Sequence, residues 1–109
     1  GNRERLAEAR IAINQARLHV LHCAWKLDAF GVEGAASEVS EIKAAVPRMA
    51  CQVIDLAIQL HGGAGVSADT PLAAAYATAR ALRLADGPDE VHLGVVARHL
   101  LRPYQSDQR

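Results

Sequence analysis

From Asn2 to Ala29 the chain has no glycine or proline, and this forms most of its longest stretch without either residue. Apolar residues recur in it every seven positions, and alanines fill the same face: Leu6, Ile13, Val20 and Leu27, with Ala9, Ala16 and Ala24. Because residues seven apart lie on one side of an α-helix, the pattern predicts one long helix. The whole chain has 109 residues, which is enough for one domain with one core.

A second apolar stripe follows the same predicted helix. Ile11, Leu18 and Trp25 also repeat every seven residues, and they lie about 140° around the helix from the first stripe. A helix with two apolar stripes must be covered on two sides. One stripe can pack inside the domain, and we expect the other to pack against a neighbouring domain or subunit in a homo-oligomer.

Helix signals continue through the rest of the chain. Phe30-Gly31 and Gly34 end the first helix, and a second runs from Ser37, a candidate N-cap, to about Leu60. Pro47 lies inside it and predicts a kink near residues 43–46, because proline removes a backbone hydrogen bond. The segment Gly62–Gly65 then opens a loop.

Two further helices follow that loop. The third begins at Thr70-Pro71, with Asp69 or Thr70 as its cap, and runs to about Leu84. The fourth begins after residues 86–90, carries helically spaced Val91, Val95, Leu100 and Leu101, and ends at Pro103, with residues 104–109 frayed. We therefore predict an all-α fold, a helical bundle of about four helices.

Composition supports this fold class and excludes several partners. Half of the residues are apolar but only 4% are aromatic, which favours closely packed helices over a β-sandwich. Lys plus Arg balance Asp plus Glu, so nothing suggests nucleic acid or a charged membrane as a partner. No apolar run reaches the roughly 20 residues of a membrane span, and no signal peptide opens the chain. A cytoplasmic location, or the mitochondrial matrix in a eukaryote, is expected, with Cys23 and Cys51 unpaired.

The first candidate site is the segment from Gln59 to Gly65. A helix end needs one glycine for a left-handed cap, whereas this segment has three glycines in four residues. Backbone without side chains allows another molecule to approach closely, and Gln59 offers both a donor and an acceptor. Ordinary loop chemistry and a ligand contact both remain open here.

The second candidate site is the segment from Asp86 to Glu90. Asp86 or Gly87 could cap the fourth helix, with Pro88 in its first turn and acidic Asp89 and Glu90 complementing the helix dipole. Alternatively, a carboxylate beside a glycine at a helix start could face a cleft as a general base. The pattern alone leaves both interpretations open.

Two other groups of residues have weaker signals. His19, His22 and Cys23 share one helix face, but no carboxylate stands on that stretch of the face, and we expect no metal site. Arg80 and Arg83 predict a solvated or salt-bridged edge, with contact to a phosphate as an alternative.

Both candidate sites resemble motifs of the acyl-CoA dehydrogenase family. The stretch from Asp55 to Val66 is similar to the family's helix end and its Gln-x-x-Gly-Gly turn. The stretch from Ala79 to Gly87 resembles the Arg-containing helix that leads to the catalytic acid and its following glycine. The Ala-Asp-Gly-Pro-Asp-Glu-Val-His run and Pro47 look most like a branch whose animal members can carry a kinase-like domain. The resemblance covers nearly the whole chain.

The resemblance implies roles for individual residues. Asp86 matches the base that removes the pro-R α-proton of an acyl-CoA thioester while the β-hydride passes to N5 of FAD, giving a trans-2-enoyl-CoA. Many relatives have Glu there, one methylene longer. Asp86 and Gly87 would contact substrate. Gln59, Gly62 and Gly63 match a segment that contacts FAD of a neighbouring subunit. Pro88, Asp89 and Glu90 match one near the FAD ribose and adenine, where relatives often have Gln in place of Glu90.

The same resemblance implies what the 109 residues do not include. They correspond to the C-terminal helical domain without its first helix, and the N-terminal helical and middle β-domains are absent. We therefore expect the fragment alone to be inactive. The parent is expected to be a homotetrameric flavoprotein of fatty acid metabolism that passes electrons to electron-transfer flavoprotein. An acyl-CoA oxidase-like homologue and a stand-alone helical oligomerisation module without flavin remain alternatives.

Overall fold

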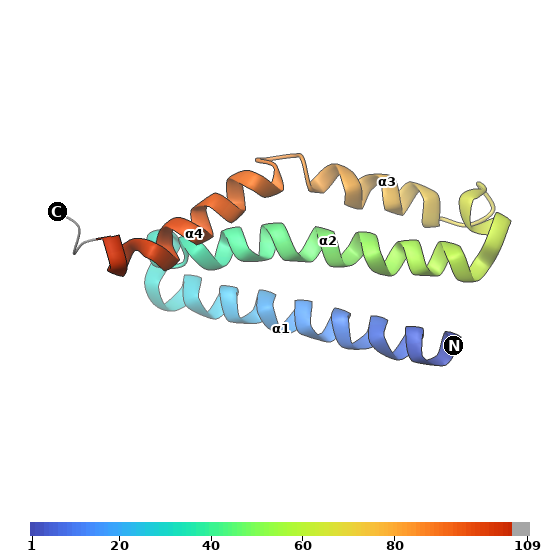
Figure 1. Cartoon of the computed structure of the whole chain (residues 1–109), viewed down its shortest axis with the longest axis horizontal. Coiled ribbons are helices and arrows are strands. Elements are labelled where there is room, and N and C mark those ends of the chain that lie inside the picture. The colour runs from blue at the N-terminus through green and yellow to red at the C-terminus, as the bar shows by residue number, and fades with distance from the viewer. Residues whose placement is uncertain (106–109) are drawn as a thin grey trace.

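The computed structural model describes residues 1–105, and its regular elements are all helical, as predicted. In chain order they are α1 (Asn2–Gly34), α2 (Ala36–His61), the short 3-10 helix η1 (Gly62–Val66), α3 (Leu72–Leu82) and α4 (Asp89–Gln105). Figure 1 shows α2 in the middle, with α1 along one side and α3 followed by α4 along the other. Within the described residues, α2 is the helix that packs against all three others.

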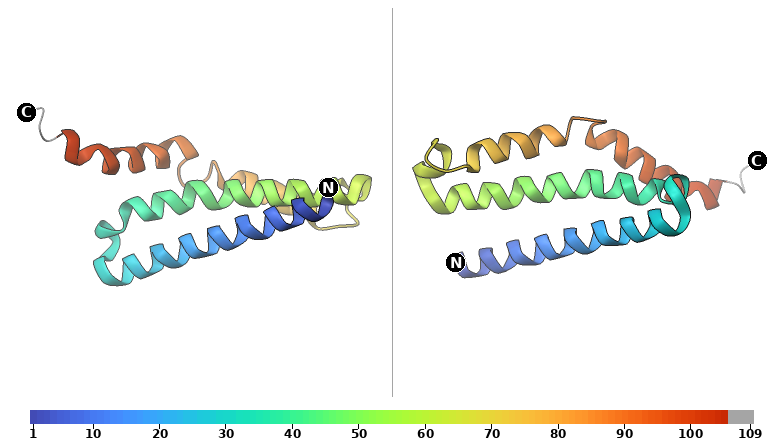
Figure 2. Two further views of the ribbon diagram at one scale, coloured as in Figure 1. Left: turned by 60° about the horizontal axis from the view of Figure 1, so that its bottom comes forward. Right: turned by 180° about the vertical axis from the view of Figure 1, so that it is seen from behind.

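The arrangement is extended rather than compact. The radius of gyration is 17.2 Å, whereas a compact chain of this length is expected to have about 13 Å. Two further views show the same open stack of helices (Figure 2). The buried apolar residues are mostly small: Cys23, Ala35, Ala44, Cys51 and Ala79. The fold thus leaves much of its large apolar surface uncovered.

The two stripes of α1 have different surroundings, as the sequence predicted. Four residues of the first stripe, Ala9, Ile13, Ala16 and Leu27, are partly buried, whereas Leu6, Val20 and Ala24 remain exposed. In the second stripe Ile11, Leu18 and Trp25 keep 56%, 66% and 58% of their surface exposed. The predicted stop is visible at Gly31, where φ is 75° and ψ is −178°, before a last helical turn that ends at Gly34.

Several predicted helix boundaries were wrong. Ser37 does not cap α2, because α2 begins at Ala36 and the Ser37 hydroxyl donates to Oε2 of Glu41, one turn further on. Pro47 is buried inside α2, as predicted, and the helix continues beyond it to His61. Packing of α2 against the other three helices helps it to continue despite the hydrogen bond that proline cannot donate.

The helices after η1 also differ from prediction. Pro71 is the N-cap of α3 rather than a first-turn residue, the side-chain oxygen of Thr70 accepts from the Leu72 N–H at 3.4 Å, and α3 ends at Leu82. Pro103 does not end α4, which continues through Tyr104 to Gln105. The predicted fraying of residues 104 and 105 was therefore wrong, and residues 106–109 lie outside the described part of the chain.

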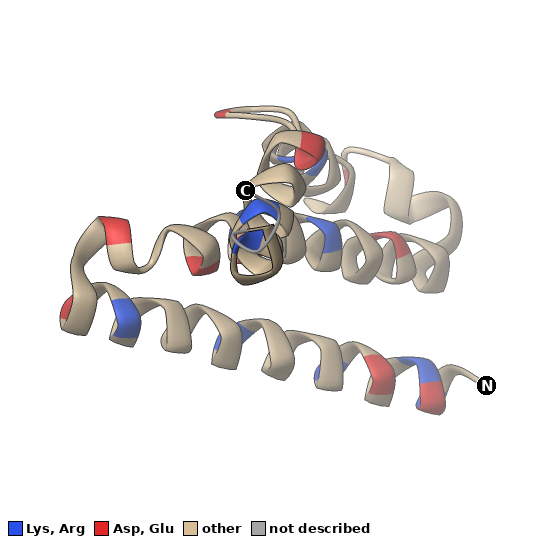
Figure 3. Cartoon of the chain, turned by 60° about the vertical axis from the view of Figure 1, so that its left-hand side comes forward, with Lys and Arg blue, Asp and Glu red and all other residues tan. Residues whose placement is uncertain are grey.

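Charge and hydropathy place no further constraint on the fold. Acidic and basic residues are interspersed along the chain instead of gathering on one element (Figure 3). Among the described helices, none is both long and apolar enough to cross a membrane.

Candidate active site

The turn between α3 and α4 carries Asp86 in an uncommon backbone conformation. Asp86 has φ of 55° and Gly87 has φ of 97°, so two consecutive residues lie in the left-handed region. This region costs most L-residues about 1–2 kcal/mol, although Asp tolerates it better than most. A Cβ on Gly87 would also lie 3.0 Å from Nε2 of His92. The turn therefore requires glycine at position 87 and holds Asp86 in a strained conformation.

Two side chains from outside the turn bind its backbone. Lys43 of α2 donates from Nζ to the carbonyl oxygens of Leu82, at 2.6 Å, and Ala85, at 2.9 Å. His92 of α4 donates from Nε2 to the carbonyl oxygen of Asp86, at 3.1 Å. The carbonyl groups of Ala85 and Asp86, two consecutive residues, are thus held from two different helices.

The hydrogen bonds of His92 define its tautomer. A carbonyl oxygen can only accept, so Nε2 must carry a hydrogen. In the neutral ring Nδ1 then has a free lone pair, and it lies 3.3 Å from the hydroxyl oxygen of buried Ser40. Ser40 of α2 can donate to that nitrogen. The ring orientation is therefore fixed at both ends, by α2 and by the turn.

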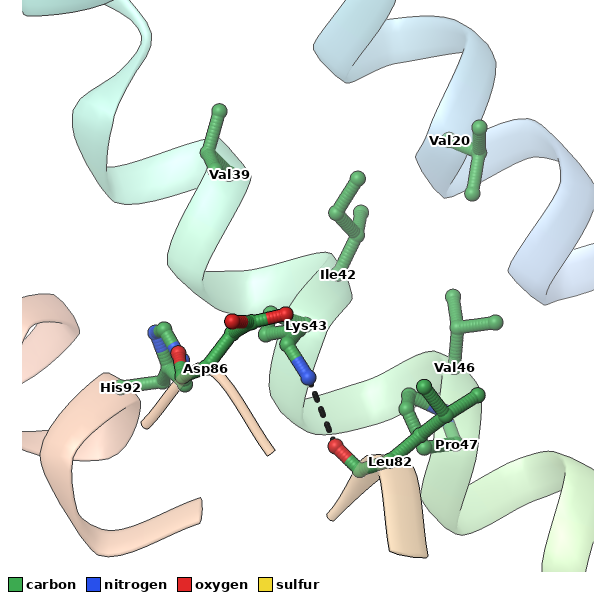
Figure 4. Close-up of a pocket in the computed structure, with 9 residues that line it drawn as sticks. All are labelled: Val20, Val39, Ile42, Lys43, Val46, Pro47, Leu82, Asp86 and His92. Atoms are coloured by element: carbon green, nitrogen blue, oxygen red, sulfur yellow. Dashed lines mark hydrogen bonds between the residues drawn. The ribbon is translucent and has the colours of Figure 1, made fainter. Parts of the chain in front are cut away.

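The carboxylate of Asp86 has no hydrogen-bond or ion-pair partner among the described residues and is exposed. It lies at the edge of an open groove of about 510 Å³. The other groove residues are mainly apolar: Val20, Val39, Ile42, Val46, Pro47 and Leu82, with Lys43 and His92. Figure 4 shows the Asp86 side chain extending from the turn toward α2. The free carboxylate is available to a second molecule.

The expectation that Asp86 or Gly87 caps α4 was wrong. Helix α4 begins at Asp89, and the N–H of Asp89 donates to the carbonyl oxygen of Arg83 instead. The carbonyl of Pro88 accepts from the N–H groups of Val91 and His92, so Pro88 precedes the first turn rather than lying in it. The Asp86 side chain binds no helix N–H among the described residues, so helix capping does not explain why an aspartate stands at this position.

Asp89 joins the turn to the rest of the domain. It is buried, and its Oδ2 accepts from Nε of Arg83 at 2.9 Å and lies 3.7 Å from a terminal nitrogen of Arg48. Burial alone raises the pKa of Asp89, but the hydrogen bond and charge of Arg83, with the charge of Arg48, bring it below its usual value. Arg83 therefore forms a salt bridge, one of the two roles predicted for it. Of the three residues expected near the adenine, Glu90 is exposed.

The glycines after α2 have different structural roles. Gly62 ends α2 with φ of 67°, a conformation that favours glycine. Gly65 is buried, and a Cβ there would lie 2.7 Å from the backbone oxygen of Ile58. Gly63 has no positive φ, and a Cβ there would meet no atom within 4 Å, so the fold does not require glycine at this position. Exposed Gln59 lies on the same helix end.

The structure does not bring the two candidate sites together. Gln59, Gly62 and Gly63 lie before the start of α3, and Asp86 follows the end of that helix. Since α3 has 11 residues, the helix alone separates the sites by about 16 Å. Each site must therefore contact a different part of a ligand, or a different ligand.

The histidines and the cysteine of α1 form no metal site. No group of three or more His, Cys, Asp or Glu residues among those described could hold a metal ion. His19 instead donates to Oε1 of Glu41 at 3.3 Å, and the ring of His22 stacks on Trp25. Burial, with the nearby charges of Glu38 and Glu41, raises the pKa of the Cys23 thiol and disfavours the thiolate that binds metals.

Sequence reasoning missed Lys43, Ser40 and His92 as residues of the site. Lys43 and Ser40 lie on α2, far before the turn in the chain, so no local motif connects them to it. His92 stands at the end of the motif, but its relation to Asp86 depends on the left-handed turn. Only the packing of α4 on α2 reveals the contact with Ser40.

Comparison with known proteins identifies the family of this chain. The family model described as "Acyl-CoA dehydrogenase, C-terminal domain" matches residues 1–101. The chain belongs to the acyl-CoA dehydrogenase family. A solved structure described as an acyl-CoA dehydrogenase from Mycobacterium abscessus is 71% identical, with a TM-score of 0.93 over 95% of this chain and 26% of that one.

Curated relatives of this acyl-CoA dehydrogenase domain come from bacteria, animals and plants. Probable acyl-CoA dehydrogenase FadE2 of Mycobacterium tuberculosis is 55% identical over 85% of the chain and 23% of its own length. Acyl-CoA dehydrogenase family member 11 of Homo sapiens is 54% identical over 89% of the chain and 12% of its own length. The chain thus spans less than a quarter of the length of these relatives.

Proposed function

We propose that this domain supplies the catalytic base, Asp86, of an FAD-dependent acyl-CoA dehydrogenase that forms the α,β double bond of acyl-CoA thioesters. The observation that carries this proposal is the free carboxylate of Asp86 on a strained turn whose carbonyls are held from two helices. Strained residues concentrate at functional sites, and a helix cap does not account for this one. Asp86 would accept the α-proton of the thioester.

Three of the proposed cofactor-contact residues, Gln59, Gly63 and Glu90, are exposed and are left free by the fold. Gly63 is open although the fold does not need glycine there, which suits close approach by a second molecule. Gln59, Gly62 and Gly63 would contact FAD of a neighbouring subunit, and Pro88, Asp89 and Glu90 would lie near the ribose and adenine. When bound, FAD would accept the hydride from the β-carbon. The separation of the two sites along α3 fits contacts to two different regions of the assembly.

The test is Asp86→Asn in the full-length enzyme. Asn keeps the shape and tolerates a positive φ, so the turn should survive while the proton acceptor is lost. We expect the rate of flavin reduction by acyl-CoA to fall about 10³-fold with FAD still bound. Stopped-flow absorbance under anaerobic conditions measures this rate. Reduction at nearly the wild-type rate would show that the base lies elsewhere.

The 109 residues alone are expected to be inactive and to lose flavin. They would contact one edge of one FAD molecule and a part of the FAD bound to a neighbouring subunit. Absorbance after desalting measures retained FAD, and a stoichiometric amount would contradict this expectation. In the full-length enzyme, transfer of electrons to electron-transfer flavoprotein rather than to oxygen would separate a dehydrogenase from an oxidase-like homologue, which releases hydrogen peroxide.

A further inference from the structure

Asp86 is held by side chains whose contacts are all to backbone or to each other. We propose that Lys43, His92 and Ser40, here called the turn clamp, are positioning residues that aim the Asp86 carboxylate at the α-proton of the thioester. This inference rests on the proposed function and extends it to three residues outside the motif. None of the three binds the carboxylate itself.

Backbone hydrogen bonds close the turn at its two ends, from the Ala85 N–H to the Ala81 carbonyl and from the Asp89 N–H to the Arg83 carbonyl, but the carbonyls on either side of Asp86 are bound by Lys43 and His92. Asp86 and Gly87 both have positive φ, and the chain there is outside α3 and α4. Lys43 binds the carbonyl of Ala85, which precedes Asp86, and His92 binds the carbonyl of Asp86 itself. The direction of the Cα–Cβ bond is set by these flanking atoms, so two fixed carbonyls limit the rotation that would carry the carboxylate away.

The two ends of His92 allow position to be separated from stability. The amide nitrogen of Gln at position 92 can reach the place of Nε2 and donate to the Asp86 carbonyl. The shorter amide of Asn reaches only the place of Nδ1 and keeps the contact with Ser40. Each variant retains one of the two hydrogen bonds, and His92→Gln, which leaves the buried Ser40 hydroxyl without its partner, should be the less stable of the two. Only one keeps the contact that positions Asp86.

The experiment compares His92→Gln with His92→Asn in the full-length holoenzyme. We expect His92→Asn to lower the limiting rate of flavin reduction about 10²-fold, the scale of a displacement near 1 Å. His92→Gln should stay within about tenfold of wild type, because the base remains in place. Bound FAD and the KM for acyl-CoA should be similar in the two variants, and the melting temperature should be no lower in His92→Asn than in His92→Gln.

A second readout isolates the proton step. An acyl-CoA whose β-carbon carries methyl groups in place of hydrogens cannot lose hydride, yet its α-hydrogens can exchange with deuterated water. Mass spectrometry of the recovered thioester measures this exchange. It should be slow in His92→Asn and near wild type in His92→Gln, in parallel with the reduction rates.

Two substitutions of Lys43 give an independent test. Lys43→Met keeps the aliphatic stem but loses both donors, whereas Lys43→Arg retains several N–H donors. The rate should fall in the first and largely return in the second. This pair decides the question if His92→Asn does not yield folded holoenzyme.

The outcomes separate the two proposals. Equal rates in wild type and His92→Asn, with Asp86→Asn inactive, overturn the clamp and leave the base assigned. A rate that falls in step with the melting temperature across the two His92 variants shows a purely structural role and also overturns it. A fully active Asp86→Asn enzyme would contradict the proposed function itself.

Discussion

Gly63 and Gly65 lie two residues apart in η1 and have opposite surroundings. A Cβ at Gly65 would lie 2.7 Å from the oxygen and 2.8 Å from the Cα of Ile58, which are backbone atoms that cannot turn away. We expect Gly65→Ala to lower the free energy of unfolding by about 1–3 kcal/mol, the usual cost of overpacking. Thermal or urea denaturation of the full-length protein measures this loss.

Gly63→Ala is the matched control for that substitution. A Cβ at Gly63 meets no atom within 4 Å, so stability should change by less than about 0.5 kcal/mol. In the full-length enzyme we expect the same substitution to weaken FAD binding, measured by titration of the apoenzyme. Unchanged FAD affinity would mean that the open glycine does not face the cofactor.

Asp89 gives a prediction about pH. Its folded-state pKa lies below the ordinary value of 3.8 despite burial, because Arg83 and Arg48 stabilise the carboxylate. A lowered pKa adds stability that is fully present above the unfolded value and is lost as pH falls through the folded value. We expect Asp89→Asn to destabilise the protein by about 1–3 kcal/mol near neutral pH. The wild-type and variant unfolding curves should converge below about pH 3.8; a constant difference would contradict the salt bridge as its cause.

Individual residues of the site were only partly predictable from the sequence. The motif around Asp86 and Gly87 identified the candidate base because its residues are adjacent in the chain. The clamp was not predictable, because Ser40 and Lys43 come to the turn only through the packing of α2 against α3 and α4. Hydrogen bonds between distant helices depend on rotation and register, and helical periodicity does not determine either.

At the scale of elements, one buried ion pair joins α1 to α2. Nζ of Lys26 lies 2.6 Å from Oε1 of Glu38, whose other oxygen is buried without a hydrogen-bond partner among the described residues. The hydrogen bond from Lys26 holds the pKa of Glu38 below its usual value, against the effect of burial. Glu38 therefore adds stability above its unfolded pKa that is lost as pH falls through its lower folded pKa.

Lys26→Met should leave a buried carboxylate without its cation. We expect a loss of about 2–4 kcal/mol near neutral pH, below the full cost of a buried pair because Lys26 is partly exposed. Guanidinium denaturation measures the loss. Adding Glu38→Gln in the Lys26→Met background removes the buried charge and should recover much of the stability. A double variant no more stable than Lys26→Met would contradict this account.

Helix positions were predictable because apolar periodicity extends over many residues, but helix ends were less so. The break at Gly31 and the end of α2 at Gly62 follow from glycine at positive φ. The predictions at Ser37 and Pro103 were wrong because serine and proline also occur inside helices. There, packing or a side-chain partner offsets their effect on the backbone. The Ser37 hydroxyl finds such a partner in Glu41.

The whole molecule has more surface than a compact domain of its mass. The accessible area is 7682 Å², whereas the size relation for folded monomers gives about 5,800 Å². Much of the exposed apolar surface belongs to α1, where Ile11, Leu18 and Trp25 form one stripe. The two-stripe pattern predicted this from the sequence, because a residue's angle around a long helix follows directly from its position.

The stripe predicts that the 109-residue chain associates with itself in solution. Leu18 is 66% exposed at the centre of the stripe, so Leu18→Glu should place a charge in the contact and shift the chain toward monomer. Ala24 is also exposed and lies about 120° around α1 from Leu18, so Ala24→Glu adds the same charge outside the stripe. Sedimentation velocity at tens of micromolar, with circular dichroism to confirm equal helix content, compares the three chains. We expect wild type and Ala24→Glu to associate alike; a monodisperse wild-type monomer, or equal loss of association in both variants, would show that the stripe is not the contact.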